Sequence, residues 1–123
     1  MKAFRLRGKE RTLEDFGAWL TQRSERDGGE AEAGVTNNPA CCPIARWLVE
    51  SDAALRLAKV NPDEILAFTH DFGTRPVSQV HTPAWVMRFI DLIDTPNSVE
   101  EPISYNTALK ALAQVMEQAE DEE

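Results

Sequence analysis

The sequence is poor in the residues from which catalytic and metal sites are most often built. It contains two cysteines and two histidines in 123 residues. The cysteines are adjacent, and a disulfide between neighbours strains the peptide that joins them, so no disulfide framework is expected. No apolar run approaches the roughly 18 residues of a membrane-spanning helix. The basic N-terminal segment lacks the apolar core of a signal peptide. We therefore expect a cytoplasmic protein that does not contact a membrane.

Zinc ligands are another absence. Structural zinc sites usually take ligands in pairs, about two to four residues apart on a tight turn. Cys41 and Cys42 are neighbours whose side chains point apart, and His70 and His81 stand eleven residues from each other. We predict no metal site.

Phosphate-binding glycine patterns are also missing. Gly28-Gly29 is not followed by Lys and Ser or Thr, and Gly73 stands alone. A loop that cradles phosphate needs those residues at fixed spacing. We predict no nucleotide and no other cofactor.

Charge is what the sequence has in excess, and it is unevenly distributed. The formal net charge is −8. Residues 1–26 carry seven Lys and Arg against four Asp and Glu, whereas residues 27–123 carry six against seventeen. An acidic field of this size repels nucleic acid and favours basic partners, although solubility alone is the alternative explanation. The basic first segment lacks interleaved aromatics for base stacking, so we interpret it as a solvated strand face.

Apolar periodicity predicts the fold class. Hydrophobic residues make up 42% and charged residues 28% of the chain, which is typical of a globular protein, and the length fits a single domain over 1–123. Helical spacing predicts helices at 13–24, 43–51, 83–95 and from 105 onward. Alternation predicts a strand at 4–7, a β-hairpin within 55–70 and a further short strand near Val77 and Val80. We predict an α+β fold in which about four helices pack on a small, mainly antiparallel sheet.

Capping residues and tryptophans refine this prediction. The hydroxyls of Thr12, Thr82 and Ser104 each precede an apolar helical pattern and are expected to cap it. Trp47 and Trp85 lie on apolar helical faces, so we expect both in the core.

Two stretches carry no apolar pattern. Residues 25–40 are rich in glycine and acids, and we predict a flexible surface loop there. The tail at 117–123 carries five acids, and we expect it to fray.

Two short motifs carry a resemblance. The residues Cys42-Pro43-Ile44-Ala45-Arg46-Trp47-Leu48 resemble a helix start, of Cys-Pro-Leu-Ala-Arg-Tyr-Leu type, in small uncharacterised bacterial and phage proteins. A Pro-x-Trp-x-x-x-Phe helix follows in those proteins, as at Pro83, Trp85 and Phe89, and then an alanine-rich helix. The resemblance covers roughly residues 38–115. It implies a shared α+β fold, and it implies no reaction, cofactor or site.

One cysteine offers a possible chemistry. Cys42 precedes a helix N-terminus, where the helix dipole lowers the pKa of a thiol. His70 or His81 would have to supply the base through a contact in the folded chain. The alternative is that Cys42 is a small buried apolar residue. A cysteine-dependent enzyme or thiol redox sensor is therefore the second hypothesis for function.

The preferred hypothesis is a non-enzymatic acidic protein that binds a basic protein partner. Four carboxylates, Asp91, Asp94, Glu100 and Glu101, follow one another from the last turns of the third predicted helix to the segment before the fourth, and we predict that they form its binding surface. Anti-defence and regulatory proteins of mobile elements have this chemistry. The narrower expectation is therefore an inhibitor of a nucleic-acid-handling host protein.

Overall fold

The computed structural model describes residues 3–70, 75–96 and 99–122, and side chains as far as residue 118. Its elements follow one another in the order β1 (Phe4–Leu6), β2 (Lys9–Arg11), α1 (Leu13–Asp27), β3 (Glu32–Val35), α2 (Pro43–Glu50), β4 (Leu57–Val60), β5 (Glu64–Phe68), β6 (Ser78–His81), α3 (Ala84–Asp94), β7 (Pro102–Ser104) and α4 (Tyr105–Glu122). The α+β prediction is confirmed.

The strands of the described residues form three small antiparallel sheets in place of the single expected sheet. Strand β4 pairs with β5, and β5 pairs with β6. The other two sheets are the hairpin β1–β2 and the pair β3–β7. The β1–β2 turn places Arg7 and Gly8 at φ 55° and 78°. Positive φ at both central residues matches the twist of a two-residue hairpin, which Gly8 adopts without steric penalty.

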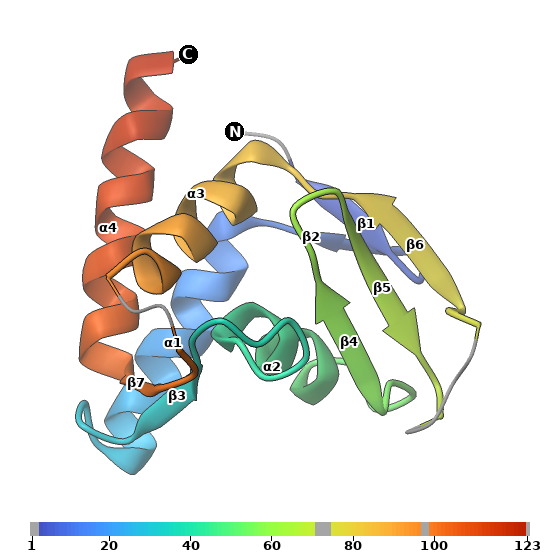
Figure 1. The fold of residues 1–123 in the computed structure, drawn as a ribbon, viewed down its shortest axis with the longest axis horizontal. Helices are drawn as coiled ribbons and strands as arrows, with labels where there is room; N and C mark the ends of the chain where they lie inside the picture. Colours follow the sequence, from blue (N-terminus) through green and yellow to red (C-terminus); the bar gives the residue numbers. More distant parts are fainter. Residues whose placement is uncertain (1–2, 71–74, 97–98, 123) are drawn as a thin grey trace.

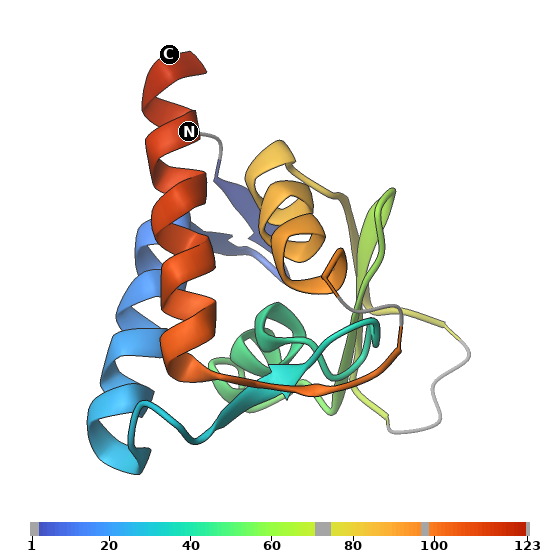
Figure 2. The ribbon, with the colours of Figure 1, turned by 60° about the vertical axis from the view of Figure 1, so that its left-hand side comes forward.

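Helices α1 and α4 lie on the side of the molecule opposite the three-stranded sheet, and α2 and α3 lie between them and the sheet (Figure 1). Helix α4 packs along α1 and α3, and α2 packs on β4. Strand β7 and the residues before it run beside β3, close to the start of α4 (Figure 2). This pairing joins the chain after α1 to the chain after α3.

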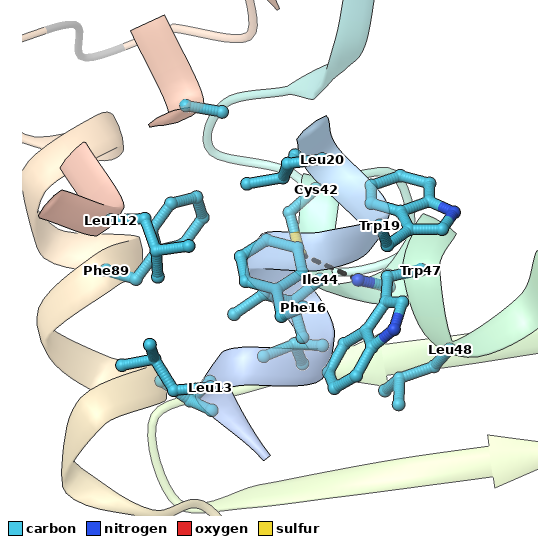
Figure 3. Close-up of a cluster of buried hydrophobic side chains, with 14 of the residues drawn as sticks. Leu13, Phe16, Trp19, Leu20, Cys42, Ile44, Trp47, Leu48, Phe89 and Leu112 are labelled. Atoms are coloured by element: carbon cyan, nitrogen blue, oxygen red, sulfur yellow. Dashed lines mark hydrogen bonds between the residues drawn. The ribbon is translucent and has the colours of Figure 1, made fainter. Parts of the chain in front are cut away.

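An aromatic cluster fills the core. The Phe16 ring is fully buried and lies 5.2 Å from the Trp47 ring and 5.1 Å from the Phe89 ring, centroid to centroid. Trp85 lies 6.2 Å from the same ring. Figure 3 shows Phe16, Trp47 and Phe89 of this cluster with aliphatic side chains from α1, α2 and α4 around them. The burial of Trp47 and Trp85 is confirmed, each being 2% exposed.

Two of the three expected helix caps are confirmed. Thr12 Oγ1 accepts the N–H of Asp15 at 3.0 Å, and Ser104 Oγ accepts the N–H of Thr107 at 3.2 Å. The prediction for Thr82 is wrong. Its hydroxyl donates to the carbonyl of Asn61 at 2.7 Å, and α3 begins after Pro83 without a side-chain cap. Thr82 thus ties the β4–β5 turn to the start of α3.

The stretch 25–40 has more regular structure than expected. Helix α1 continues to Asp27, and β3 occupies Glu32–Val35. Strand β3 runs so close to the start of α2 that a Cβ on Gly34 would lie 2.6 Å from the backbone nitrogen of Pro43. At the other end of the chain, α4 includes most of the tail that was expected to fray and ends at Glu122.

Candidate functional site

The four predicted binding carboxylates lie around the C-terminal end of α3. Asp91 and Asp94 are one helical turn apart, and Asp91 is exposed whereas Asp94 is half-buried. Glu100 and Glu101 are exposed in the segment that leads from α3 into β7. The pair on α3 and the pair before β7 belong to different segments, so further contacts are needed to bring the two pairs together.

Residues 36–38, which follow β3, hold the segment after α3 in place. The Thr36 backbone N–H donates to the Glu101 carbonyl at 2.8 Å, and Thr36 Oγ1 accepts the Glu101 N–H at 3.2 Å. The same hydroxyl donates to the Val99 carbonyl at 3.3 Å. Thr36 is 2% exposed, and its polar atoms are satisfied by this segment. The backbone before β7 is therefore fixed against residues 36–38.

Two asparagines extend the link to the carboxylates themselves. The Asn37 N–H donates to Asp94 Oδ1 at 2.9 Å, and Asn38 Nδ2 donates to Glu100 Oε1 at 3.0 Å. Asn37 has a φ of 57°, a left-handed conformation that asparagine tolerates better than most residues. Asn37 and Asn38 thereby bring the end of α3 and the segment before β7 to one surface. We call Asp91, Asp94, Glu100 and Glu101 the acidic face.

Burial perturbs one member of the acidic face. Desolvation raises the pKa of Asp94 above its ordinary value, the Asn37 N–H opposes that rise, and the negative charge of Asp91 adds to it. The charges of Asp91 and Asp94 therefore repel each other in the folded protein.

Some acids outside the acidic face are paired with arginines. Arg23 pairs with Glu50 at 3.0 Å and Arg46 with Glu32 at 2.8 Å. Arg7 Nε pairs with Asp52 Oδ2 at 2.8 Å and holds the pKa of that carboxyl below its ordinary value. Among the described residues, no ion pair joins a carboxylate of the acidic face to a basic side chain.

Cys42, the residue of the cysteine hypothesis, is a buried helix cap. Its Sγ accepts the Ala45 N–H at 3.4 Å and lies 3.9 Å from the Pro39 carbonyl, to which the thiol can donate. The side chain is 3% exposed and lies in the core close to Phe16 and Ile44 (Figure 3). Burial raises the pKa of the thiol to about 12, although the helix N–H groups oppose that rise. At neutral pH the thiol is protonated, which is the opposite of what a thiolate nucleophile needs.

The two histidines lie apart from Cys42. His81 is exposed on β6, with Glu64 as its partner across the sheet, and His70 is exposed after the end of β5. Among the described residues, neither histidine makes a hydrogen bond to Cys42. The geometry does not assemble a cysteine–histidine pair.

No metal site is formed by the part of the chain that the structure describes. There, no three His, Cys, Asp or Glu side chains are close enough to hold one ion. Within the acidic face, one carboxylate oxygen of Asp94 and one of Glu100 already accept hydrogen bonds from asparagines.

The basic N-terminal hairpin is not simply the solvated face that its composition predicts. Arg7 and Lys9 approach Asp52 after α2, at 2.8 and 3.9 Å. Arg11 is 6% exposed, stacks over the Trp47 ring at 5.4 Å and donates to Ser51 Oγ at 2.6 Å. Desolvation lowers the pKa of Arg11, opposed by the charge of Asp52. The prediction of a solvated position is wrong for Arg11, which holds the hairpin on α2.

A hollow of about 340 Å³ lies away from the acidic face, between α2, the start of β4 and the start of α4. Ala45, Val49 and Leu57 provide apolar walls, and Tyr105 closes one side. Two of its charged residues are already engaged, since Arg46 pairs with Glu32 and Glu50 with Arg23. The hollow therefore offers few free polar groups to a ligand.

Sequence reasoning found the carboxylates of this face and missed the residues that assemble it. Thr36, Asn37 and Asn38 lie in the stretch expected to be a loop, and their one sequence signal is the turn-forming Asn-Asn-Pro at 37–39.

Comparison with known proteins supplies no further guide. No family model, no curated protein and no solved structure matches this chain. Among the described residues, no helix combines the length and the apolar character needed to cross a bilayer.

Proposed function

We propose that this protein is a non-enzymatic binding protein whose acidic face contacts a basic surface on a protein partner. One observation carries the proposal. Asn37 and Asn38 join Asp94 at the end of α3 to Glu100 before β7, and among the described residues no basic side chain forms an ion pair with the acidic face, whereas Glu32, Glu50 and Asp52 are each paired with an arginine. Gathering like charges raises the free energy of the folded state, and a basic partner would lower it again.

The chemistry favours a protein over a nucleic acid. A phosphate backbone is repelled by the acidic face and by the net charge of −8. In the N-terminal hairpin, Arg7 is paired with Asp52 and Arg11 stacks on the Trp47 ring, so these cations are already engaged. A basic protein that itself handles nucleic acid has the complementary surface, so we propose inhibition of such a host protein as the narrower function.

A cysteine-dependent activity receives no support from the surroundings of Cys42. The thiol is buried, its pKa is raised to about 12, and it caps a helix that packs in the core. Cys42→Ser is therefore expected to alter stability rather than partner binding.

The proposal is tested by affinity capture from a host lysate with three baits. These are the wild-type protein, Asp91→Lys, and Glu25→Lys as the matched control. Glu25 is exposed on α1, outside the acidic face, and its reversal changes the net charge by the same amount. We expect mass spectrometry to find a basic protein retained by the wild type and by Glu25→Lys and lost from Asp91→Lys.

Two results would contradict the proposal. One is a partner retained equally by all three baits, which would place binding elsewhere. The other is direct binding of nucleic acid to this protein, without the partner, that depends on Asp91. The inhibitory function is tested separately, by asking whether the captured partner loses its nucleic acid when this protein is added.

A further inference from the structure

The outer side of α3 carries apolar groups as well as acids. Met87, Asp91 and Asp94 follow at spacings of four and three residues, so they form one stripe along the helix. Met87 is 39% exposed, and Ile90 beside it is half-buried. The buried residues of α3, which include Trp85 and Phe89, lie on the opposite side and face the core. The solvent-facing side of α3 thus carries apolar residues, Met87 and Ile90, followed by the acids Asp91 and Asp94.

Shallow hollows flank Asp91 on both sides. On one side, Pro62, Met87 and Ile90 line a small depression between α3 and the β4–β5 turn. On the other, Leu92 and Pro96, together with the polar side chains of Arg88, Thr95 and Gln118, line a hollow of about 400 Å³ against α4. Asp91 borders both. Asp91 therefore stands between a depression with apolar walls and a mixed hollow that Arg88 also lines.

The stripe continues beyond the end of the helix. Val99 is 59% exposed and lies next to Glu100, and its carbonyl accepts hydrogen bonds from Thr36 Oγ1 and Asn37 Nδ2. Since Asn37 also holds Asp94, Val99 is fixed near the end of α3. Two exposed large apolar side chains, Met87 and Val99, consequently lie at the two ends of the same acidic stripe.

We propose that this stripe, from Met87 through Asp91 and Asp94 to Val99, is the docking surface for a basic amphipathic helix of the partner. The inference rests on the proposed function and specifies what the partner presents. Charge complementarity selects lysine and arginine on the docking helix, opposite Asp91 and Asp94. The exposed apolar groups select leucine- or isoleucine-like side chains on the same face of that helix, seated beside Met87 and Val99.

The dimensions of the stripe suit a helix. Seven residues separate Met87 from Asp94, which corresponds to about 10 Å along the helix axis, and Val99 lies beyond that end. A partner helix of about three turns covers this length, with apolar positions recurring every three or four residues. Acids alone would give an electrostatic contact that salt abolishes, whereas the apolar ends add a contact that salt does not screen.

The test uses a defined probe. A fluorescein-labelled 18-residue peptide of leucine and lysine, patterned as an amphipathic helix, is titrated with the full chain by fluorescence anisotropy. The control peptide has the same composition in scrambled order, which keeps its charge and removes its apolar face. The variants are Met87→Gln and Val99→Ser, with Met116→Gln as the matched control because Met116 is exposed to 44% on α4.

We expect the patterned peptide to bind more tightly than the scrambled one. Met87→Gln and Val99→Ser should each weaken binding roughly five- to tenfold, as loss of an apolar anchor does, and Met116→Gln should leave it unchanged. Circular dichroism of the bound peptide should show added helix.

Three outcomes of the peptide titration would overturn this inference. They are equal binding of both peptides, absence of binding by either, and wild-type affinity in both Met87→Gln and Val99→Ser. In each case the proposed function is judged separately, by whether Asp91→Lys still loses the captured basic partner. If that partner is lost while Met87→Gln retains it, the acidic face binds without an apolar anchor. If sedimentation shows self-association that Met87→Gln abolishes, the occupant is a second copy of this chain and the inference fails.

Discussion

Replacing Gly34 with alanine tests how closely β3 approaches α2. A Cβ at this position would lie 2.6 Å from the Pro43 nitrogen and 2.9 Å from the Cys41 carbonyl oxygen, whereas ordinary contacts begin at 3.4 Å. The nearer atom would have to move by about 0.8 Å, the difference between 3.4 and 2.6 Å. Both atoms belong to the backbone, so no side-chain rotation relieves the clash, and the 2.9 Å bond from the Val35 N–H to the Cys41 carbonyl would be strained.

The expected loss follows from the cost of overpacking, about 1–3 kcal/mol of unfolding free energy. Unfolding entropy is about 2.1 cal/mol/K per residue near 60 °C, so this loss lowers the Tm of a chain of this length by about 4–12 °C. The control is Gly17→Ala in α1. There the new Cβ lies 3.1 Å from a rotatable side-chain atom, Cδ2 of Leu112, and alanine gains about 1 kcal/mol of helix propensity.

Thermal unfolding followed by circular dichroism separates the two variants. We expect Gly34→Ala to melt well below the wild type and Gly17→Ala to melt within about 3 °C of it or above it, given roughly 0.26 kcal/mol of unfolding free energy per degree for this chain. A Gly34→Ala protein that melts with the wild type would refute the close approach of β3 to α2, and with it the placement of residues 36–38 beside the acidic face.

Four further predictions follow from the same structure. Trp85→Ala should cost about 3–5 kcal/mol, measured by chemical denaturation; an unchanged midpoint would mean that α3 does not bury this face. Cys41 should react with iodoacetamide at neutral pH while Cys42 reacts only after unfolding, because a pKa of about 12 leaves its thiolate fraction roughly one in ten thousand or less; equal rates would contradict its burial. Since burial raises the folded-state pKa of Asp94 above 3.8, the folded state binds its proton more tightly than the unfolded state, and stability from this group falls as pH rises through the raised pKa. Asp94→Asn, which keeps an acceptor for the Asn37 N–H, should therefore reduce the loss of stability between acidic and neutral pH; identical pH profiles would exclude this contribution. Purified protein should contain no stoichiometric metal, and a chelator should leave its Tm unchanged; one zinc per chain by elemental analysis would overturn this.

Local signals in the sequence predict much of the fold. The position of α2 is predicted correctly from Pro43 in the first turn and from the apolar spacing of Ile44, Trp47 and Leu48. These residues lie in the helix itself, so its start and its buried face can both be inferred from the local sequence. The same reasoning predicts the burial of Trp85 on α3. Both helices owe their positions to patterns that a few consecutive residues contain.

Pairings between distant segments are not predictable in this way. The strands β3 and β7 are four and three residues long and pair across most of the chain, with Gly34 opposite Ile103. Such short strands show no usable alternation, and their pairing depends on packing between segments that are distant in the sequence. Thr82 illustrates the same limit: its hydroxyl can cap α3 or bind the Asn61 carbonyl, and only the folded β4–β5 turn decides.

The candidate site shows both cases. The spacing of Asp91 and Asp94 on one helix can be predicted from the sequence, and the excess of acids can be counted there. The contacts of Asn37 with Asp94 and of Asn38 with Glu100 depend on the β3–β7 pairing, so they cannot be predicted from the sequence. Nor does composition tell which acids are neutralised, since Glu32 and Glu50 look like Glu100 in the sequence and are paired by arginines in the structure.

The most direct test of the acidic face is the ionic-strength dependence of partner binding. The dissociation constant of the captured partner should be measured between about 50 and 500 mM salt, a range over which the Debye length falls from roughly 14 to 4 Å. For the wild type we predict weakening of about tenfold or more across this range, and for a double variant carrying Asp91→Lys and Glu101→Lys we predict weak binding with little salt dependence. Wild-type binding that is independent of salt and survives the double reversal would contradict the account.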